Sequence, residues 1–341
     1  MKVLLRPARL LARLMIGASV LVSAVPAQAE SITISATRSV ATAAAFIAQD
    51  KGYFAAEGLQ VDFKYFDAAQ PVAVAVASGD AQFGVTALSA GFYNMAGKKA
   101  LKLIASAGRE EPGFSSVPYF VSAKSFASGV HAPKDLAGKT VGLTQVGSPA
   151  HFSLAKLAEK YKFPLASIRL VPLQSFPNIV AATKGGAIDG GILASFSAFP
   201  AQDRGDGKII GWVGDETPWQ LSAVFTSNNT ATSKHALVAR FLRAYDKGAA
   251  DFAAAFQQGE GKGRRQDGPG QADLLQIISK YSQLSDKQVL QGLDYIRPDG
   301  ALDPADIRDQ VATWQRLGLV DKAVNADAIV DLSYAPAGTR R

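Results

Sequence analysis

The sequence predicts an α/β protein built as two lobes, each a doubly wound sheet with helices on both faces. The first observation is a strand, a helix and a strand in succession at 32–66, a unit typical of parallel sheets. The second is that strands and helices continue to alternate to residue 107 and begin to alternate again at 139. The third is size, because 341 residues, 48% of them hydrophobic, exceed the length at which a single core stops growing.

The first unit is defined by its hydrophobic pattern and by its glycines. Ile32–Thr37 alternates apolar and polar residues and is rich in β-branched types, and Val61–Phe66 alternates again. Between them, Ala41–Lys51 is a good helix former. We expect Gly52 to end this helix with a positive φ angle and Gly58 to form the turn into the second strand.

The first lobe continues to about residue 123. Its expected elements are a helix at 71–77, a strand at 81–86, a helix at 88–96 that begins near Ser89, a strand at 101–107, a loop at 108–113 and a strand at 117–123 that leaves the lobe.

The second lobe follows a turn-rich connection at 125–137. Its expected strands lie at 139–143, 168–172, 187–193 and 209–213, and its expected helices at 150–161 and 178–184. Ser148 and Pro149 have the residue types preferred at the N-cap and first position of the helix at 150–161. A strand at 221–227 returns to the first lobe.

The remaining chain predicts helices that cover one lobe. A long amphipathic helix spans 234–257, and a Gly-rich loop spans 259–270. Four further helices are expected at 271–280, 286–292, 304–317 and 322–329.

The N-terminus has the composition of a secretory signal peptide over residues 1–29, with cleavage expected before Glu30. Four basic residues, an apolar run at 14–25 and the small-residue site Ala27-Gln28-Ala29 support this reading. We therefore expect the protein to be exported and to reside in the periplasm. Without the leader, the net charge of +7 falls to +3, with basic and acidic residues interspersed, which disfavours nucleic acid as a partner.

The composition also excludes or disfavours several kinds of catalytic and metal site. The chain has no cysteine, which excludes disulfides, thiolate metal sites and a cysteine nucleophile. His131, His151 and His235 are far apart in sequence and lack the spacing of metal ligands. We expect no metal and no cofactor.

Four motifs occur in order along the first two thirds of the chain. They are Ile-Ala-Gln-Asp-Lys-Gly-Tyr-Phe-Ala-Ala-Glu-Gly-Leu-Gln-Val at 47–61, Ala-Ser-Gly-Asp-Ala-Gln-Phe-Gly-Val at 77–85, Asp-Leu-Ala-Gly-Lys-Thr-Val-Gly at 135–142 and Gly-Ala-Ile-Asp-Gly-Gly at 186–191. In this combination the chain resembles the ABC-transporter periplasmic substrate-binding proteins of the nitrate, sulfonate and taurine type, which also include the thiamine-precursor group.

The resemblance implies a periplasmic binding protein type II fold, or Venus flytrap, with two lobes joined by crossover strands near 119–123 and 223–227. On this basis we expect 30–122 together with 225–341 to form the first lobe and 123–224 to form the second. The resemblance also implies a small-molecule ligand in the cleft, an inner-membrane ABC permease with its cytoplasmic ATPase as partners, and no enzymatic activity. We expect a monomer.

Ligands in such a cleft bind to loops at the carboxyl ends of strands, where helix N-termini point their amide groups inward. These loops and nearby aromatic residues supply the candidate ligand-binding residues, which are Arg38, Ser39, Val40, Gln70, Leu88, Ser89, Arg109, Gly147, Ser148, His151, Ser195, Phe196 and Trp219.

Several candidates have a second interpretation that the sequence leaves open. Arg38 is either a ligand cation or a solvated residue after a strand, and Arg109 is either a ligand cation or the partner of Glu110, Glu111 or another acid. The serines at 89 and 148 are helix caps that also offer a hydroxyl. His151, in the first turn of its helix, is expected to be a neutral donor because the helix dipole disfavours a cation there.

The second lobe departs from the family pattern at one place. Many relatives carry Trp-Glu-Pro where this chain has Ala194-Ser195-Phe196. The missing acidic side chain favours a neutral or anionic ligand over a protonated heterocycle. Phe196 and Trp219 either pack in the core or face the cleft, and in the second case they favour an organic anion over nitrate.

We therefore expect a solute-binding protein that captures a sulfonate or an aromatic or aliphatic carboxylate and delivers it to the permease. The alternatives are a neutral or cationic heterocycle such as a pyrimidine or a riboflavin-like ligand, a ligand-sensing role, and an enzyme on the same fold.

Overall fold

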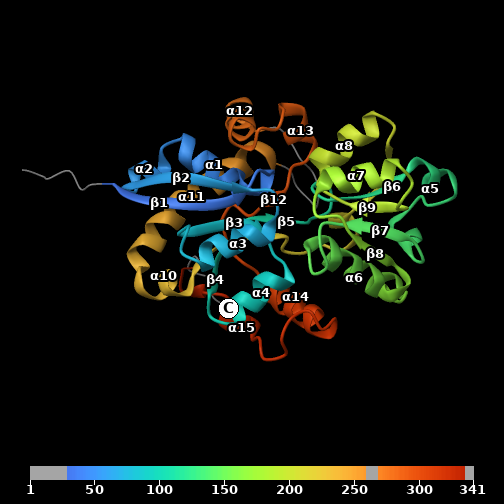
Figure 1. The fold of residues 1–341 in the computed structure, drawn as a ribbon. Coiled ribbons are helices and arrows are strands. Elements are labelled where there is room, and N and C mark those ends of the chain that lie inside the picture. The colour runs from blue at the N-terminus through green and yellow to red at the C-terminus, as the bar shows by residue number, and fades with distance from the viewer. Residues whose placement is uncertain (1–28, 259–267, 335–341) are drawn as a thin grey trace, which may run out of the picture.

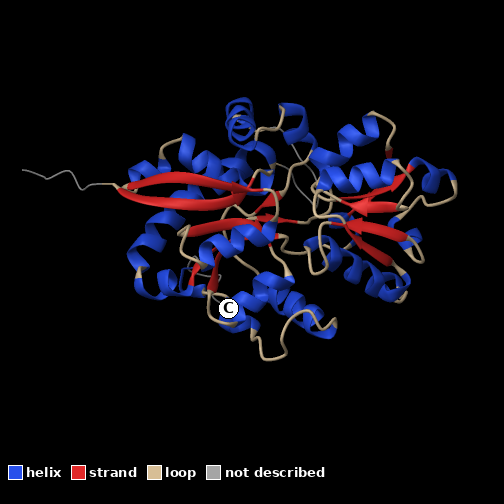
Figure 2. Ribbon diagram, in the orientation of Figure 1, coloured by secondary structure: helices blue, strands red, loops and turns tan. Residues whose placement is uncertain are grey.

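The structure, a computed structural model, describes residues 29–258 and 268–334. Figure 1 shows two α/β lobes side by side, and Figure 2 shows a sheet flanked by helices in each. The predicted signal peptide, apart from its last residue, and most of the predicted loop at 259–270 lie outside the described residues.

The first sheet has the strand order β2-β1-β3-β11-β4. β1 runs parallel to β2 and β3, and β11 runs antiparallel to β3 and β4. Because β1 and β3 are parallel neighbours, the loops at their carboxyl ends lie at the same edge of the sheet. The strands are β1 Glu30–Thr37, β2 Leu59–Phe66, β3 Phe83–Ala87, β4 Leu101–Ser106 and β11 Ser222–Ser227.

The second sheet has the order β10-β6-β9-β7-β8. β7 runs parallel to β8 and β9, so the loops that follow β7 and β9 also share one edge. The strands are β6 Pro118–Ser122, β7 Thr140–Leu143, β8 Arg169–Pro172, β9 Gly190–Ile192 and β10 Gly207–Trp212. A small antiparallel ribbon pairs β5 Gly108–Arg109 with β12 Tyr295–Ile296.

The two crossings between the lobes lie a few residues earlier in the chain than the sequence predicted. The crossovers were expected near 119–123 and 223–227, with 117–122 in the first lobe. Instead, β6 pairs with β9 and β10 inside the second sheet, and β11 pairs with β3 and β4 inside the first. Both strands are apolar and buried, and each pairs with its neighbours inside one sheet. The chain therefore crosses between the lobes just before each strand, at 110–117 and at 217–221. We call these two segments the hinge.

Most of the helices lie where the hydrophobic pattern predicted them. Ser89 caps its helix, and Gly52 and Gly58 have φ angles of 72° and 70°, as expected. The helix predicted at 322–329 is shorter, because the Asn325 side chain caps a later start. The connection predicted at 125–137 contains two short helices.

The helices of the first lobe are η1 Val40–Thr42, α1 Ala43–Asp50, α2 Tyr53–Ala56, α3 Ala69–Ala77, α4 Ala90–Gly97, α10 Asn228–Ser233, α11 His235–Phe256, α12 Gln271–Ser282, α13 Asp286–Gln291, α14 Pro304–Arg316, α15 Ala326–Ile329 and η4 Leu332–Tyr334. Those of the second lobe are α5 Ala123–Ala127, η2 Pro133–Leu136, α6 Pro149–Tyr161, η3 Leu165–Ser167, α7 Phe176–Lys184, α8 Ser195–Asp203 and α9 Val213–Glu216. Within 29–258 and 268–334, no helix is both long and apolar enough to cross a bilayer.

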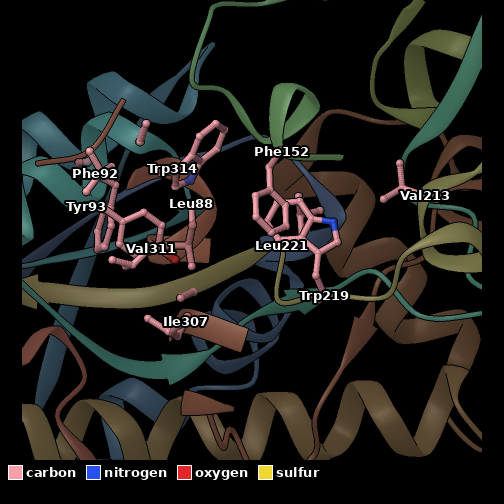
Figure 3. Packing of buried hydrophobic residues seen from close by; sticks show 14 of the residues in the cluster. Leu88, Phe92, Tyr93, Phe152, Val213, Trp219, Leu221, Ile307, Val311 and Trp314 are labelled. Atoms are coloured by element: carbon pink, nitrogen blue, oxygen red, sulfur yellow. The ribbon is translucent and has the colours of Figure 1, made fainter. Parts of the chain in front are cut away.

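The hydrophobic core continues across the boundary between the lobes. One cluster lies inside the first lobe, where α11 packs closely against α1 at Gly248. A second cluster joins residues of both lobes, including Leu88 of the first lobe and Phe152 of the second. Figure 3 shows part of this second cluster. The lobes are therefore in contact, which corresponds to a closed arrangement of a two-lobed protein.

Candidate functional site between the lobes

The carboxyl-end loops of the two sheets meet at a direct backbone contact. The amide of Ala90, at the start of α4, donates a hydrogen bond to the carbonyl of Gly147 in the loop after β7, at 2.9 Å. Gly147 has a φ angle of +83°, and a Cβ at this residue would lie 3.1 Å from the Cβ of Ala90. Glycine is thus needed at 147 both for its backbone conformation and for the close approach of the lobes.

Beside this contact, the N-terminus of α6 carries an unpaired hydroxyl. Ser148 occupies the N-cap position and Pro149 follows at the first helical position, as the sequence predicted. The Ser148 hydroxyl makes no capping bond, and although the residue is only 2% exposed, its Oγ has no hydrogen-bond partner within 29–258 and 268–334. A helix N-terminus presents unpaired backbone amides and a partial positive charge, so this hydroxyl and these amides together suit a hydrogen-bond acceptor.

His151 lies in the first turn of the same helix, and its surroundings favour the neutral ring. Its Nδ1 accepts a hydrogen bond from the Gly147 amide at 3.1 Å, so its proton is on Nε2. Burial lowers the pKa of His151, which further favours the neutral ring. The ring packs edge-on against Trp314 of α14, with centroids 5.5 Å apart.

Three aromatic rings from three different parts of the chain line this region. Phe152 of α6 lies 4.4 Å from the ring of Trp219 in the hinge and 5.7 Å from the ring of Trp314 in α14. Figure 3 shows these rings beside Leu88 and Leu221. All three aromatic side chains are at least 97% buried. Trp219, a predicted candidate, is therefore part of the interlobe core, and Trp314 joins it although the sequence did not single it out.

Several buried donors in this region make no hydrogen bond within the described part of the chain. They are Thr86 Oγ1 near the end of β3, Ser148 Oγ, Trp219 Nε1 and Trp314 Nε1. An indole N–H can only donate, and a hydroxyl can donate as well as accept. The described residues contain no group of three or more histidine and acidic side chains placed to hold a metal ion.

The candidate ligand-binding residues Gln70, Leu88 and Ser89 of the first lobe make hydrogen bonds within the protein. Ser89 Oγ donates to Gln70 Oε1 at 3.1 Å and accepts the Phe92 amide at 3.2 Å. Leu88 is fully buried, and its amide donates to the Leu221 carbonyl in the hinge at 2.8 Å. These residues therefore support the loop between β3 and α4, and Ser89 acts as a helix cap.

The loop after β1 contains Arg38, Ser39 and Val40. The Arg38 guanidinium lies 3.8 Å from the ring centroid of Tyr65 and donates to the Tyr281 carbonyl at 3.0 Å. It is therefore neither a free cation nor a simply solvated residue. Ser39 Oγ lies 3.2 Å from the Thr37 hydroxyl, and Val40 is buried.

Arg109 is held by internal ion pairs. Its guanidinium bonds Glu111 at 3.1 Å, as one of the sequence interpretations expected, and Asp306 at 2.5 Å. Asp306 lies 197 residues further along the chain, on α14, and nothing in the sequence pointed to it. A third bond goes to the side chain of Gln220 in the hinge, at 3.2 Å. Arg109 therefore ties the hinge to α14.

Ser195 and Phe196, at the start of α8, face the C-terminal part of the first lobe. The Ser195 amide donates to the Ser116 carbonyl of the hinge at 3.0 Å, and its side chain lies against Gly292. The Phe196 ring packs on Phe176 with centroids 5.9 Å apart, and the Phe196 carbonyl accepts the Gln288 amide group at 3.2 Å. Phe196 is thus partly a packing residue of the second lobe.

Comparisons with known proteins agree with this architecture. The family model described as "NMT1/THI5 like" matches residues 40–258. The taurine-binding periplasmic protein of Escherichia coli (strain K12) is 27% identical over 192 residues, which cover 54% of this chain and 54% of that protein. The match therefore spans about half the length of that curated relative. These findings confirm the resemblance that the four motifs predicted.

Solved structures show the same fold. The aliphatic sulphonate binding protein SsuA of Escherichia coli superposes with a TM-score of 0.69 at 15% identity, covering 89% of this chain and 92% of that one. The alkanesulfonate-binding protein SsuA of Xanthomonas axonopodis pv. citri, bound to MOPS, gives 0.68 at 18% identity, covering 89% and 99%. The two-lobed periplasmic binding protein fold predicted from the sequence is confirmed.

Proposed function

The chain belongs to the NMT1/THI5-like family, and from this premise we propose that it is a solute-binding protein that holds a small organic anion between its lobes. The ligand class is a sulfonate or an aromatic or aliphatic carboxylate. The names of the similar proteins, which bind taurine and alkanesulfonates, support this class. No bond of the ligand is broken.

The observation that carries the proposal is the buried hydroxyl of Ser148 at the N-terminus of α6. This hydroxyl stands at the N-cap of a 13-residue helix, has no partner in the part of the chain that the structure describes, and lies next to the contact between Ala90 and Gly147. Leaving a buried hydroxyl unpaired costs about 1–3 kcal/mol. A ligand with an anionic group can accept hydrogen bonds from the Ser148 hydroxyl and from the amides at the start of α6. Such a ligand removes the cost of the unpaired hydroxyl, and it does so only in the closed form.

The charges around the site favour a singly charged ligand. Both candidate arginines are already engaged, Arg38 with Tyr65 and Tyr281 and Arg109 with Glu111 and Asp306. The helix N-terminus contributes about half an elementary charge, and further donors such as His151 are neutral. A site of this kind compensates one negative charge better than two. Phe152 and the two indoles are buried beside this N-terminus and make its surroundings apolar, which favours an organic anion over nitrate.

The biological setting is part of the proposal. The protein is exported to the periplasm, its leader is removed before Glu30, and it acts as a monomer that delivers its ligand to an inner-membrane ABC permease coupled to a cytoplasmic ATPase. The printed names of the relatives, a taurine-binding periplasmic protein and a periplasmic aliphatic sulphonate binding protein, support the periplasmic location and the binding role.

A thermal-shift screen of the chain from Glu30 onward tests the proposal. The ligands are taurine, ethanesulfonate, benzoate, nitrate, sulfate and an aminopyrimidine. A ligand at a hundredfold excess over its Kd adds about 2.7 kcal/mol to the free energy of unfolding. We expect an organic monoanion to stabilise the protein and the cationic and inorganic compounds to have little effect.

Two serines of the same helix supply the matched variants. Ser148→Ala is expected to weaken binding of the organic anion by about tenfold or more, because it removes one hydrogen bond to a charged group. Ser153→Ala is the control, because the Ser153 hydroxyl is equally buried but donates to the Pro149 carbonyl within the helix. Equal affinity of the two variants, or stabilisation by the aminopyrimidine alone, would contradict the proposed function.

A further inference from the structure

Two carboxyl groups are buried where the hinge meets the end of the chain. Glu110 is fully buried and Asp294 is 4% exposed. Glu110 lies in the first hinge segment, where its amide donates to the Trp219 carbonyl at 2.9 Å and its carbonyl accepts the Trp219 amide at 3.1 Å. Asp294 directly precedes β12, the strand that pairs with β5. The two acids thus lie against both hinge segments.

No cation among the described residues compensates these carboxyl groups. Among the described residues, neither carboxylate oxygen of Glu110 accepts a hydrogen bond of good geometry, although the Ser116 hydroxyl and the Gly214 amide face it. Asp294 Oδ1 accepts a hydrogen bond from Ser116 Oγ at 2.5 Å. The titratable groups that face Glu110 are the carboxyls of Asp294 and Asp215 and the phenol of Tyr119, which lies near the Thr217 hydroxyl.

The nearest arginine in the sequence does not reach these acids. Arg109 is turned toward Glu111, Gln220 and Asp306. A charged carboxylate without a cation or sufficient hydrogen bonds is very unfavourable in such an environment, and proteins normally respond by neutralising the group. Burial, with the nearby carboxyls, raises the pKa of Glu110 well above its usual range, and burial raises the pKa of Asp294 to about 7.

Both lobes contribute to this burial. Asp294 follows α13, which packs against α8 of the second lobe, as Figure 1 shows. Ser116, the partner of Asp294, accepts the amide of Ser195 from the second lobe, and Ser195 also lies against Gly292. A rotation that separates α13 from α8 would remove this cover from Asp294 and Ser116.

We propose that closure of the lobes is coupled to the uptake of a proton by the buried pair Glu110 and Asp294, so that pH regulates ligand retention at the hinge. The inference rests on the proposed function for its consequence, the release of ligand at higher pH, but the hinge itself is testable without ligand. In the open form the acids are hydrated and lose their protons near their ordinary pKa values, about 4. In the closed form they keep at least one proton to a higher pH.

The sign of the effect follows from this difference. Between about pH 4 and the pKa of the closed form, closing takes up a proton, so the closed form is favoured as pH falls. For one proton, the ligand affinity decreases by about tenfold per pH unit as pH rises through this window. A sulfonate is a suitable probe, because it stays ionised throughout the window.

The deciding experiment measures the distance between the lobes without ligand. The natural chain has no cysteine, so Ala56→Cys in α2 and Ala127→Cys in α5, both exposed, accept one spin label each. We expect the distance distribution to shift toward the closed form between pH 8 and pH 5.5. The double variant Glu110→Gln and Asp294→Asn, which keeps the shape of both side chains but cannot ionise, is expected to abolish the shift. Glu111→Gln, whose side chain is 24% exposed and pairs with Arg109, is the matched control and should retain it.

Two outcomes would overturn the inference. A distance that does not change with pH shows that closure and protonation are not linked. A shift toward the closed form at higher pH shows that the ionised carboxylates favour closure, as expected if they bind an ammonium group of a ligand. Calorimetry with ethanesulfonate at pH 5.5 and 7.5 then measures the loss of affinity. Failure of ethanesulfonate and the other organic anions to bind at either pH counts against the proposed function, whereas binding that is insensitive to pH counts against the hinge inference.

Discussion

Gly147→Ala tests whether the lobes close on their ligand through the contact seen in the structure. Gly147 has a φ angle of +83°, and an added Cβ would lie 3.1 Å from the Cβ of Ala90 in the other lobe. The substitution therefore has two separable effects. One is a backbone penalty that is present whether the lobes are open or closed. The other is a crowded contact that is present only when they are closed.

The two effects have different expected sizes and different readouts. The left-handed conformation costs a residue with a Cβ about 1–2 kcal/mol, which lowers the free energy of unfolding. Overpacking a close contact costs about 1–3 kcal/mol, which raises the ligand Kd by about 5- to 150-fold. Urea unfolding measures the first effect, and calorimetry with the organic anion identified by the thermal-shift screen measures the second.

Gly138→Ala separates the two effects. Gly138 lies in the same lobe and has a φ angle of +75°, but a Cβ there would meet nothing within 4 Å. It is expected to lose the same unfolding free energy as Gly147→Ala and to bind ligand like the natural protein. If both variants bind equally well, the ligand-bound lobes do not meet at Gly147 and Ala90, and the interlobe site described above is wrong.

Two further predictions follow from the buried charges. Burial raises the folded-state pKa of Asp294 to about 7, so the stability that this carboxyl contributes is fully present below its unfolded pKa and is lost as pH rises through 7. Asp294→Asn should therefore flatten the fall of the urea midpoint between pH 5 and 7.5. An unchanged slope would exclude this carboxyl as the cause of the fall. Arg109→Gln should lower the free energy of unfolding by about 1–3 kcal/mol, because it breaks charged hydrogen bonds to Asp306 and Glu111. Lys51→Gln, which breaks an exposed ion pair with Asp251, is the control and should lower it by less. Equal losses would show that the buried ion pairs stabilise the fold no more than an exposed pair does.

The class of fold could be predicted from the sequence because its signals are local. The alternating strand at Ile32–Thr37, the stop at Gly52 and the cap at Ser89 each depend on a few neighbouring residues, and each has the expected structure. The same holds for Ser148 and Pro149 at the start of α6. Backbone conformation and helix caps are decided by short-range sterics and hydrogen bonds, so neighbouring residues are sufficient to predict them.

The limits of the lobes could be predicted only approximately. A strand such as β6 has the same apolar composition whether it crosses the hinge or lies inside a sheet. Its assignment to the second sheet depends on antiparallel pairing with β9 and β10, which come more than 65 residues later in the chain. Hydrophobic pattern indicates that a strand is buried, but it does not indicate which partners bury it.

The sequence by itself determined the α/β alternation, the loops that follow the strands and the family to which the chain belongs. Only the tertiary structure decided what those loops meet: Trp314 against His151, Asp306 on Arg109, and Asp294 beside Glu110. Each of these pairs joins residues more than 150 positions apart, brought together by the packing of α13 and α14 across the hinge. The physical reason is that an ionisable group acquires its partner and its burial from the folded chain, whereas a turn or a cap acquires its conformation from adjacent residues.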